Sequence, residues 1–102
     1  MRKVEPGHLA RSLAGHDKGT LYIILEAAGE YVSLTDGKSR PVHRPKRKKK
    51  KHVQLQYPRD YTLKQKLEQK EAVSDEEIQD FLKRQNLQQQ GGNESNVEGR
   101  RN

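Results

Sequence analysis

The chain carries eight consecutive residues of which seven are cationic and none is acidic, Arg44-Pro45-Lys46-Arg47-Lys48-Lys49-Lys50-Lys51 (the basic run). Positive charge at this density repels itself, and binding to an anionic polymer relieves the repulsion. Nucleic acid is such a polymer, because phosphates bound by Lys and Arg release their condensed counterions. Two simpler interpretations of the run are a solvated, disordered tail and a nuclear-localisation patch.

Further cations and a few aromatic residues accompany the basic run. Most of the affinity for nucleic acid is expected from the run and the adjoining histidine: Arg44, Lys46, Arg47, Lys48, Lys49, Lys50, Lys51 and His52. A second, weaker patch is expected from cations in the preceding loops: Arg11, Lys18, Lys38 and Arg40. The aromatic residues are too few for a stacking platform: Tyr22, Tyr31, Tyr57, Tyr61 and Phe81. Phosphate contacts should therefore dominate over the reading of base sequence.

No pattern in the sequence predicts catalysis, a metal site or a cofactor. The four histidines have no zinc-binding spacing, and the chain has no cysteine: His8, His16, His43 and His52. Asp36 is explained by the geometry of an Asp-Gly turn rather than by acid–base chemistry. No P-loop, dinucleotide fingerprint or nucleophile elbow is present. We therefore expect a binding protein and not an enzyme, without metal or cofactor.

Composition limits how much of the chain can bury a core. Of the 102 residues, 29% are apolar and 34% are charged, which suits a core for about half of the chain. Residues 1–60 carry fourteen Lys and Arg against six acids, a net charge of +8, whereas residues 61–102 carry seven against eight, a net of −1. The cationic function is therefore expected within the first 60 residues.

The sequence also bears on where the protein works. The lack of cysteine fits a reducing compartment, so a cytoplasmic location is expected. Residues 1–7 lack the apolar segment of a secretory signal. The longest apolar stretch, Leu21 to Leu25, is too short to cross a bilayer, so no membrane partner is expected.

Short apolar runs separated by turns predict a mainly β domain over residues 5–58. The expected strands are Leu9–Leu13, Leu21–Leu25, Tyr31–Thr35, Lys38–His43 and Val53–Tyr57. Asp36-Gly37 predicts a tight hairpin after the third strand, and Pro41 places the fourth strand at an edge. Five short strands predict a small closed or partly open barrel, with residues 44–52 as a basic loop between the last two strands.

Alternation within these strands predicts which side chains face the core. The expected inward-facing residues are Leu9, Ile23, Leu25, Val32, Leu34, Val42, Val53 and Leu55. The apolar run of the second strand leaves the choice between Ile23 and Ile24 open.

Beyond residue 58 the apolar period changes to that of helices. Ser74-Asp75-Glu76-Glu77 predicts a capping box with Ser74 as N-cap, and Ile78, Phe81 and Leu82 form a narrow apolar stripe. A second short helix is expected within residues 61–71. Three strong apolar residues cannot support a core of their own, so residues 59–90 are expected to form a separable helical appendage. Residues 91–102 have no periodicity and are expected to be a disordered tail.

The turn Gly15-His16-Asp17-Lys18-Gly19 lies between two apolar strands, and this arrangement resembles the KOW motif of ribosomal and transcription-elongation proteins. Glycines at both ends leave the backbone of the turn open to a sugar-phosphate chain, and Lys18 projects from it. The resemblance extends in order through Glu30-Tyr31-Val32, Thr35-Asp36-Gly37 and the basic run. Together these segments look like the small bacterial KOW-domain RNA-binding proteins. The chain differs from many members at Tyr22, where they have glycine.

The resemblance implies an SH3-like barrel and an RNA ligand, ribosomal RNA above all, with Gly15, Lys18 and Gly19 as the KOW turn. Ribosomal or transcription-machinery proteins are further implied partners. Two other functions remain open on the sequence. One is a protein-interaction module of the transcription or translation machinery that docks through the Ser74 helix. The other is a chromatin-type reader, which would need Tyr22, Tyr31 and Tyr57 to converge into an aromatic cage.

Overall fold

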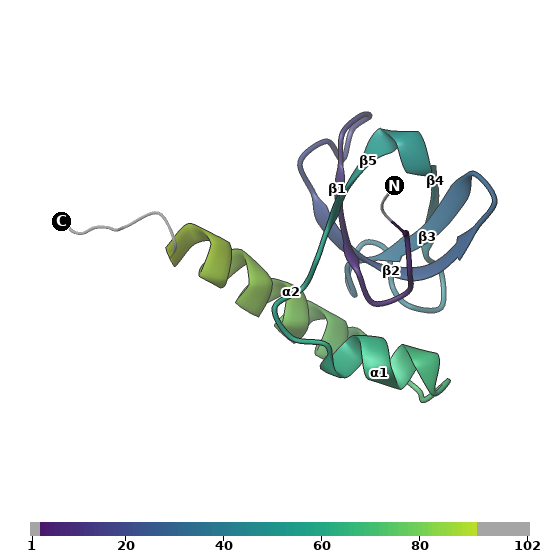
Figure 1. Cartoon of the computed structure of the whole chain (residues 1–102). Coiled ribbons are helices and arrows are strands. Elements are labelled where there is room, and N and C mark those ends of the chain that lie inside the picture. The colour runs from purple at the N-terminus through teal and green to yellow at the C-terminus, as the bar shows by residue number, and fades with distance from the viewer. Residues whose placement is uncertain (1–2, 92–102) are drawn as a thin grey trace, which may run out of the picture.

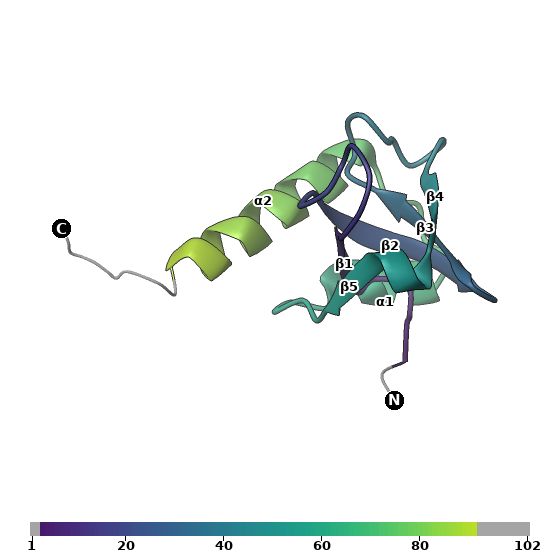
Figure 2. The same cartoon turned by 90° about the horizontal axis from the view of Figure 1, so that it is seen from above.

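A single antiparallel sheet of five strands forms the body of the protein, and two helices follow it (Figure 1). The computed structural model describes residues 3–91. The strands are β1 (Leu9–Ser12), β2 (Leu21–Ala28), β3 (Tyr31–Thr35), β4 (Lys46–Lys49) and β5 (Val53–Gln56), in the spatial order β4-β3-β2-β1-β5. The outer strands β4 and β5 are joined only by the short 3-10 helix η1 (Lys50–His52). The sheet therefore curls until the adjoining ends of its two edge strands meet, as Figure 2 shows from above.

The basic run is a strand, not the expected loop over residues 44–52. Lys46 to Lys49 pair with Leu34 to Tyr31 of β3, and the lysines that follow form η1. The strand expected at Lys38–His43 is absent, because residues 36–45 form a long connection instead of a hairpin that turns at Asp36-Gly37. Sequence reasoning missed this arrangement because four consecutive cations have no intrinsic strand signal.

The connection over residues 36–45 is bound to α2 (Asp75–Gly91) rather than to a strand. The Val42 amide donates a hydrogen bond to the Asp75 carboxylate at 2.7 Å, and the Gln79 side chain donates to the Gly37 carbonyl at 2.7 Å. Gly37 has a φ of 75°, and a Cβ there would lie 2.5 Å from the Asp75 carbonyl oxygen. Glycine at this position lets the connection lie directly against the first turn of α2.

The sheet buries apolar side chains on both of its faces. The concave face holds a cluster of five residues: Ala10, Tyr22, Ile24, Val32 and Leu34. The convex face contributes Leu9, Leu21 and Ile23 to a second cluster. Ile23 and Ile24 are thus both buried, on opposite faces, and the two-sided apolar run of β2 explains why the sequence did not distinguish them.

The expected core residues divide into two groups. Leu9, Ile23, Val32 and Leu34 are buried as expected. The other four are only partly buried: Leu25, Val42, Val53 and Leu55. Leu25 lies at a register shift between β2 and β3, and Val42 packs at the margin of the convex cluster. Four of the seven residues of the convex cluster come from the helices, which were expected outside the core.

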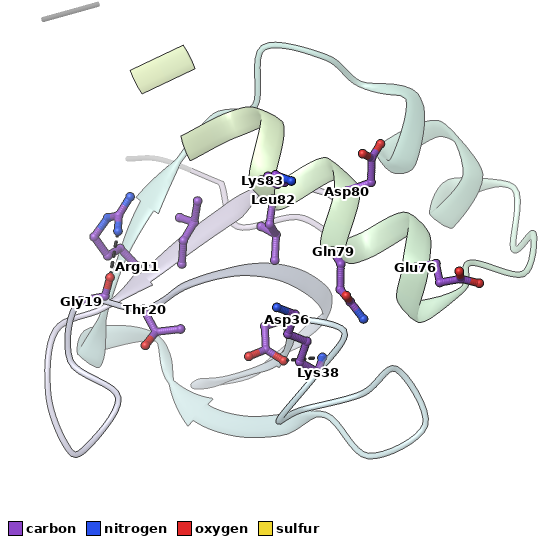
Figure 3. Close-up of a pocket in the computed structure, with 11 residues that line it drawn as sticks. Arg11, Gly19, Thr20, Asp36, Lys38, Glu76, Gln79, Asp80, Leu82 and Lys83 are labelled. Atoms are coloured by element: carbon purple, nitrogen blue, oxygen red, sulfur yellow. Dashed lines mark hydrogen bonds between the residues drawn. The ribbon is translucent and has the colours of Figure 1, made fainter. Parts of the chain in front are cut away.

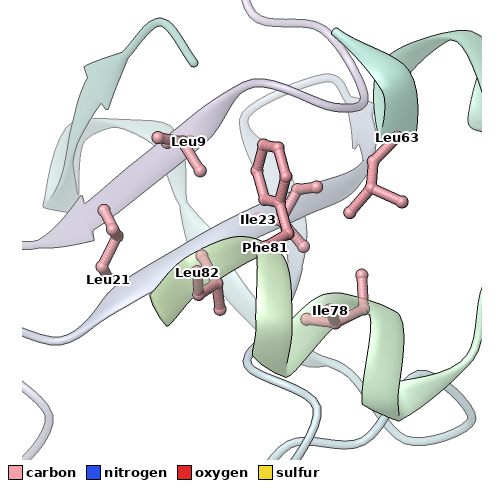
Figure 4. Close-up of a cluster of buried hydrophobic side chains, with 7 residues drawn as sticks. All are labelled: Leu9, Leu21, Ile23, Leu63, Ile78, Phe81 and Leu82. Carbon is pink, nitrogen blue, oxygen red and sulfur yellow. The ribbon is translucent and has the colours of Figure 1, made fainter. Parts of the chain in front are cut away.

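Two helices cover part of the convex face: α1 (Thr62–Glu68) and α2 (Figure 4). Leu63 from α1 and Ile78, Phe81 and Leu82 from α2 complete the convex cluster. The capping box at the start of α2 is confirmed, since Ser74 Oγ accepts from the Glu77 amide and Glu77 Oε1 accepts from the Ser74 amide.

The helices share an apolar cluster with the sheet, and the boundary expected near residue 58 cuts through this cluster. The tail expected over residues 91–102 lies outside the described residues, apart from Gly91 at the end of α2. Neither helix of the described region has the length and apolar composition to span a membrane.

Candidate nucleic-acid interface

The strand geometry of β4 sends alternate cations of the basic run to opposite faces of the sheet. Lys46 and Lys48 lie across from Leu34 and Val32, which belong to the concave cluster. Arg47 and Lys49 lie across from Ser33 and Tyr31 on the convex face. Directly opposed residues on paired strands share a face. The run that looked uniform in sequence is thus two sets of cations with different surroundings.

The inward pair, Lys46 and Lys48, shares the carboxylate of Asp17, which lies in the turn between β1 and β2. Lys48 Nζ lies 3.0 Å and Lys46 Nζ 3.3 Å from the Asp17 carboxylate. The same carboxylate accepts hydrogen bonds from Ser12 Oγ at 2.9 Å and from the Tyr22 hydroxyl at 2.7 Å. Lys48 also donates to the Ala14 carbonyl at 2.9 Å. Asp17 therefore joins β4 to the turn that connects β1 and β2.

These contacts alter the acidity of the groups involved. Burial would raise the pKa of the Asp17 carboxyl, but hydrogen bonds from Tyr22, Lys48 and Ser12 outweigh it and hold that pKa well below its usual range. Burial, together with the bond to Asp17, raises the pKa of the Tyr22 hydroxyl. At neutral pH Asp17 is therefore a carboxylate and Tyr22 a neutral phenol.

Replacing Asp17 with asparagine is expected to lower the free energy of unfolding by roughly 2–3 kcal/mol at pH 7, because Lys48, only 10% exposed, loses its counter-ion. Folding depresses the Asp17 pKa, so its contribution is complete above the unfolded-state value near 3.8 and declines as the pH falls below it. Denaturant unfolding from pH 7 to pH 2.5 should show the wild-type advantage over Asp17→Asn shrinking. Ser12→Ala removes the hydroxyl that donates to Asp17 and to the Ala14 carbonyl but leaves the lysine contacts, so it should cost only about 1 kcal/mol. A pH-independent difference would contradict this role.

The outward set faces solvent and, with its neighbours, forms the cationic edge of the molecule. We define the cationic edge as Arg44, Arg47, Lys49, Lys50 and Lys51. Arg44, Arg47 and Lys51 are exposed, and Lys49 and Lys50 are partly so. Within residues 3–85, whose side chains are described, no acid lies within ion-pair distance of any of these five. His52 is partly buried beside them, and its carbonyl accepts from the Leu13 amide.

The glycine-flanked turn has the backbone geometry expected for it. Gly15 and Gly19 have φ values of 89° and 91°, and Lys18 between them is exposed. Arg11 is less available than expected, because its guanidinium donates to the Gly19 carbonyl at 2.8 Å. Lys38 and Arg40 are exposed on the connection between β3 and β4. The second patch is therefore spread over β1, the turn that follows it and the connection between β3 and β4.

A hollow of about 740 Å³ lies between these loops and α2 (Figure 3). Arg11, Lys38 and Lys83 line it, but so do Asp36, Glu76 and Asp80. The three positive and three negative side chains balance in charge, so the hollow is not expected to attract a polyanion. Its acids lie on or next to α2, so nucleic acid is favoured at the cationic edge over this side of the molecule.

The aromatic cage that a chromatin-type reader would need is not assembled. Tyr22 is buried on the concave face, Tyr31 lies on the convex face and Tyr57 packs edge-on against His8 at 4.9 Å, so the three form no cage. The apolar stripe of α2 is buried against the sheet, so a protein partner of this helix would have to contact its acidic side, where Glu76 and Asp80 are exposed. Across residues 3–91, no group of three or more potential metal ligands is found.

Two features of the interface were missed from sequence. Asp17 was noted only as part of the glycine-flanked turn. An acid in an otherwise cationic region is a signal that could have indicated its pairing with the basic run. The Arg47 guanidinium lies 3.8 Å from the centre of the Tyr31 ring, a contact across strands that required the β3–β4 register. No protein-family model matches the chain, and no curated protein matches it either, so these features rest on the structure alone.

Proposed function

We propose that the protein binds RNA, mainly through phosphate contacts made by the cationic edge. The observation that carries the proposal is a group of five cations on β4, its 3-10 turn and the connection just before β4, with no acid of residues 3–85 within ion-pair distance: Arg44, Arg47, Lys49, Lys50 and Lys51. A surface of this kind attracts a polyanion through counterion release. Because β4 is hydrogen-bonded to β3, the backbone that carries these cations is held in place, and less entropy is lost when the ligand binds.

The choice of RNA rests on the resemblance to KOW-domain proteins. Three features support it: the strand order β4-β3-β2-β1-β5, the sharp curl of the sheet, and a glycine-flanked turn with an exposed Lys18. We propose on this basis that the sheet is an SH3-like barrel of the KOW type. Structured RNA in the cytoplasm, ribosomal RNA above all, is then the proposed ligand, with Lys18 helping to choose among structured RNAs.

The test is a salt titration of binding to several RNA oligonucleotides of equal length. If five phosphates of single-stranded RNA are neutralised, the logarithm of the binding constant should fall against the logarithm of salt concentration with a slope of about −3.5. The slope should be similar for all sequences, because phosphate contacts carry no sequence information. Duplex DNA of equal charge serves as the competitor.

Two results would count against the proposal. No binding at 50 mM salt would mean that the cationic edge is a spectator. Equal affinity for duplex DNA would mean that the protein binds polyanions without preference for RNA. If RNA binds as expected, crosslinking in cells followed by sequencing of the bound RNA identifies the ligand and tests the ribosomal assignment.

A further inference from the structure

Part of the convex face of the sheet is left open by the helices. The helices pack on Leu9, Leu21 and Ile23, which lie on β1 and the start of β2 and belong to the convex cluster. Thr35 pairs with Ile23, so the convex face continues along β3 through Ser33 and Tyr31. These two pair with Arg47 and Lys49 of β4. Neither Ser33 nor Tyr31 belongs to the convex cluster, and with Arg47 and Lys49 of the cationic edge they form a partly exposed surface, called the open surface below.

On this open surface Arg47 lies over the Tyr31 ring, with the guanidinium carbon 3.8 Å from the ring centre. A separation this short is that of a stacked cation–π pair. Tyr31 is partly buried, so its ring is held by the sheet, whereas Arg47 is exposed. The ring therefore fixes one face of a planar cation, and the opposite face of that cation remains open to solvent.

A fixed guanidinium plane is a surface on which a nucleobase can stack. Lys49, directly across from Tyr31, and Lys51, exposed in η1, can hold the phosphates that flank such a base. A base inside a duplex is stacked between its neighbours and does not offer its face to a protein side chain. The open surface therefore suits an unpaired or splayed nucleotide.

We propose that Arg47, supported by Tyr31, is a stacking site for one unpaired nucleobase, and that the protein consequently prefers single-stranded segments of RNA to duplex RNA. This inference rests on the proposed function and specifies the form of RNA that the same edge binds. Base identity is not read at this site, because every base presents a π face for stacking.

The experiment compares a single-stranded RNA oligonucleotide with one of the same length whose central nucleotides are abasic, so that the phosphates are unchanged. The wild-type protein should bind the intact RNA roughly 5- to 150-fold more tightly, the range that corresponds to a single base–aromatic stack. Arg47→Lys keeps the charge but removes the plane, so this variant should lose the preference while its salt slope stays the same. The fluorescence of a 2-aminopurine at the central position should change when the wild type binds, and change less when Arg47→Lys binds.

Two further variants separate stacking from other effects. Tyr31→Leu should also lose the preference for intact RNA, provided that its circular dichroism matches the wild type. Tyr61→Leu, which changes a tyrosine that is 43% exposed at the start of α1, should behave as the wild type. If Tyr31→Leu does not fold, Arg47→Lys still tests the stacking site, because the Arg47 side chain is exposed.

The outcomes distinguish the inference from the proposed function. Equal affinity of the wild-type protein for intact and abasic RNA, with the expected salt slope, would overturn the stacking site and leave RNA binding in place. An Arg47→Lys variant that keeps the preference would overturn the role of the guanidinium plane. Absence of RNA binding at low salt would contradict both the stacking site and the proposed function.

Discussion

Replacing Phe81 with alanine is expected to lower the free energy of unfolding of the whole protein by about 3–5 kcal/mol. Phe81 is 1% exposed and lies where β2, α1 and α2 meet, so its loss leaves a cavity that the rigid sheet cannot close. A protein of this size has roughly 5–15 kcal/mol of stability in total. The variant should therefore be marginally folded at 25 °C.

The measurement is unfolding by denaturant, monitored by two signals. Tyrosine fluorescence reports on the sheet, and far-ultraviolet circular dichroism reports on the helices. Both signals should shift together, because one apolar cluster joins the two parts. Leu13→Ala is the control, since that leucine is 48% exposed and should change stability by less than about 0.5 kcal/mol. If the sheet signal of Phe81→Ala unfolded as in the wild type, α1 and α2 would after all be a separable appendage.

The second large effect is expected at the cationic edge. Changing Lys49, Lys50 and Lys51 to glutamine removes three of its five cations and leaves Arg47 and the Asp17 contacts intact. The salt slope on single-stranded RNA should become shallower by about two units, which corresponds to a loss of roughly 50-fold in affinity at 0.15 M salt. The loss should be similar for all RNA sequences.

A variant with the same change in net charge tests whether position matters. Lys70, Lys83 and Arg84 are exposed cations on the helical side, and changing all three to glutamine should leave the slope near the wild-type value. If both triple variants reduced the slope equally, net charge rather than the cationic edge would govern binding. If the Lys49, Lys50 and Lys51 variant weakened binding to one RNA only, specific base reading would replace the phosphate interpretation.

Local chemical signals in the sequence predicted the elements that depend on them. The reciprocal bonds of Ser74 and Glu77 follow from a four-residue pattern, and the alternation of β3 placed Val32 and Leu34 inward. Glycine at both ends of the Gly15–Gly19 turn predicted a tight backbone with an exposed lysine. These features are set by neighbours along the chain, so a single sequence contains the information.

The features that were missed depend on partners distant in sequence. Nothing between residues 44 and 51 favours a strand, and β4 exists because β3 supplies hydrogen bonds and Asp17 supplies negative charge. The apolar stripe of α2 looked too narrow for a core because its complement, Leu9, Leu21 and Ile23, lies some fifty or more residues earlier. Val42 was expected in a strand, but its amide donates a hydrogen bond to the Asp75 carboxylate instead of to a neighbouring strand.

The alternation along β4 means that the order of the basic run carries information that its composition does not. Deleting one residue ahead of Lys48 would exchange the two sets, bringing side chains that now face solvent against Asp17 and turning its present partners outward. Arginine placed inward would bring a planar, forked group where two point charges now approach one carboxylate. A segment that resembles a low-complexity tract is therefore constrained residue by residue. A shuffled version with the same charge would be a different surface on a less stable protein.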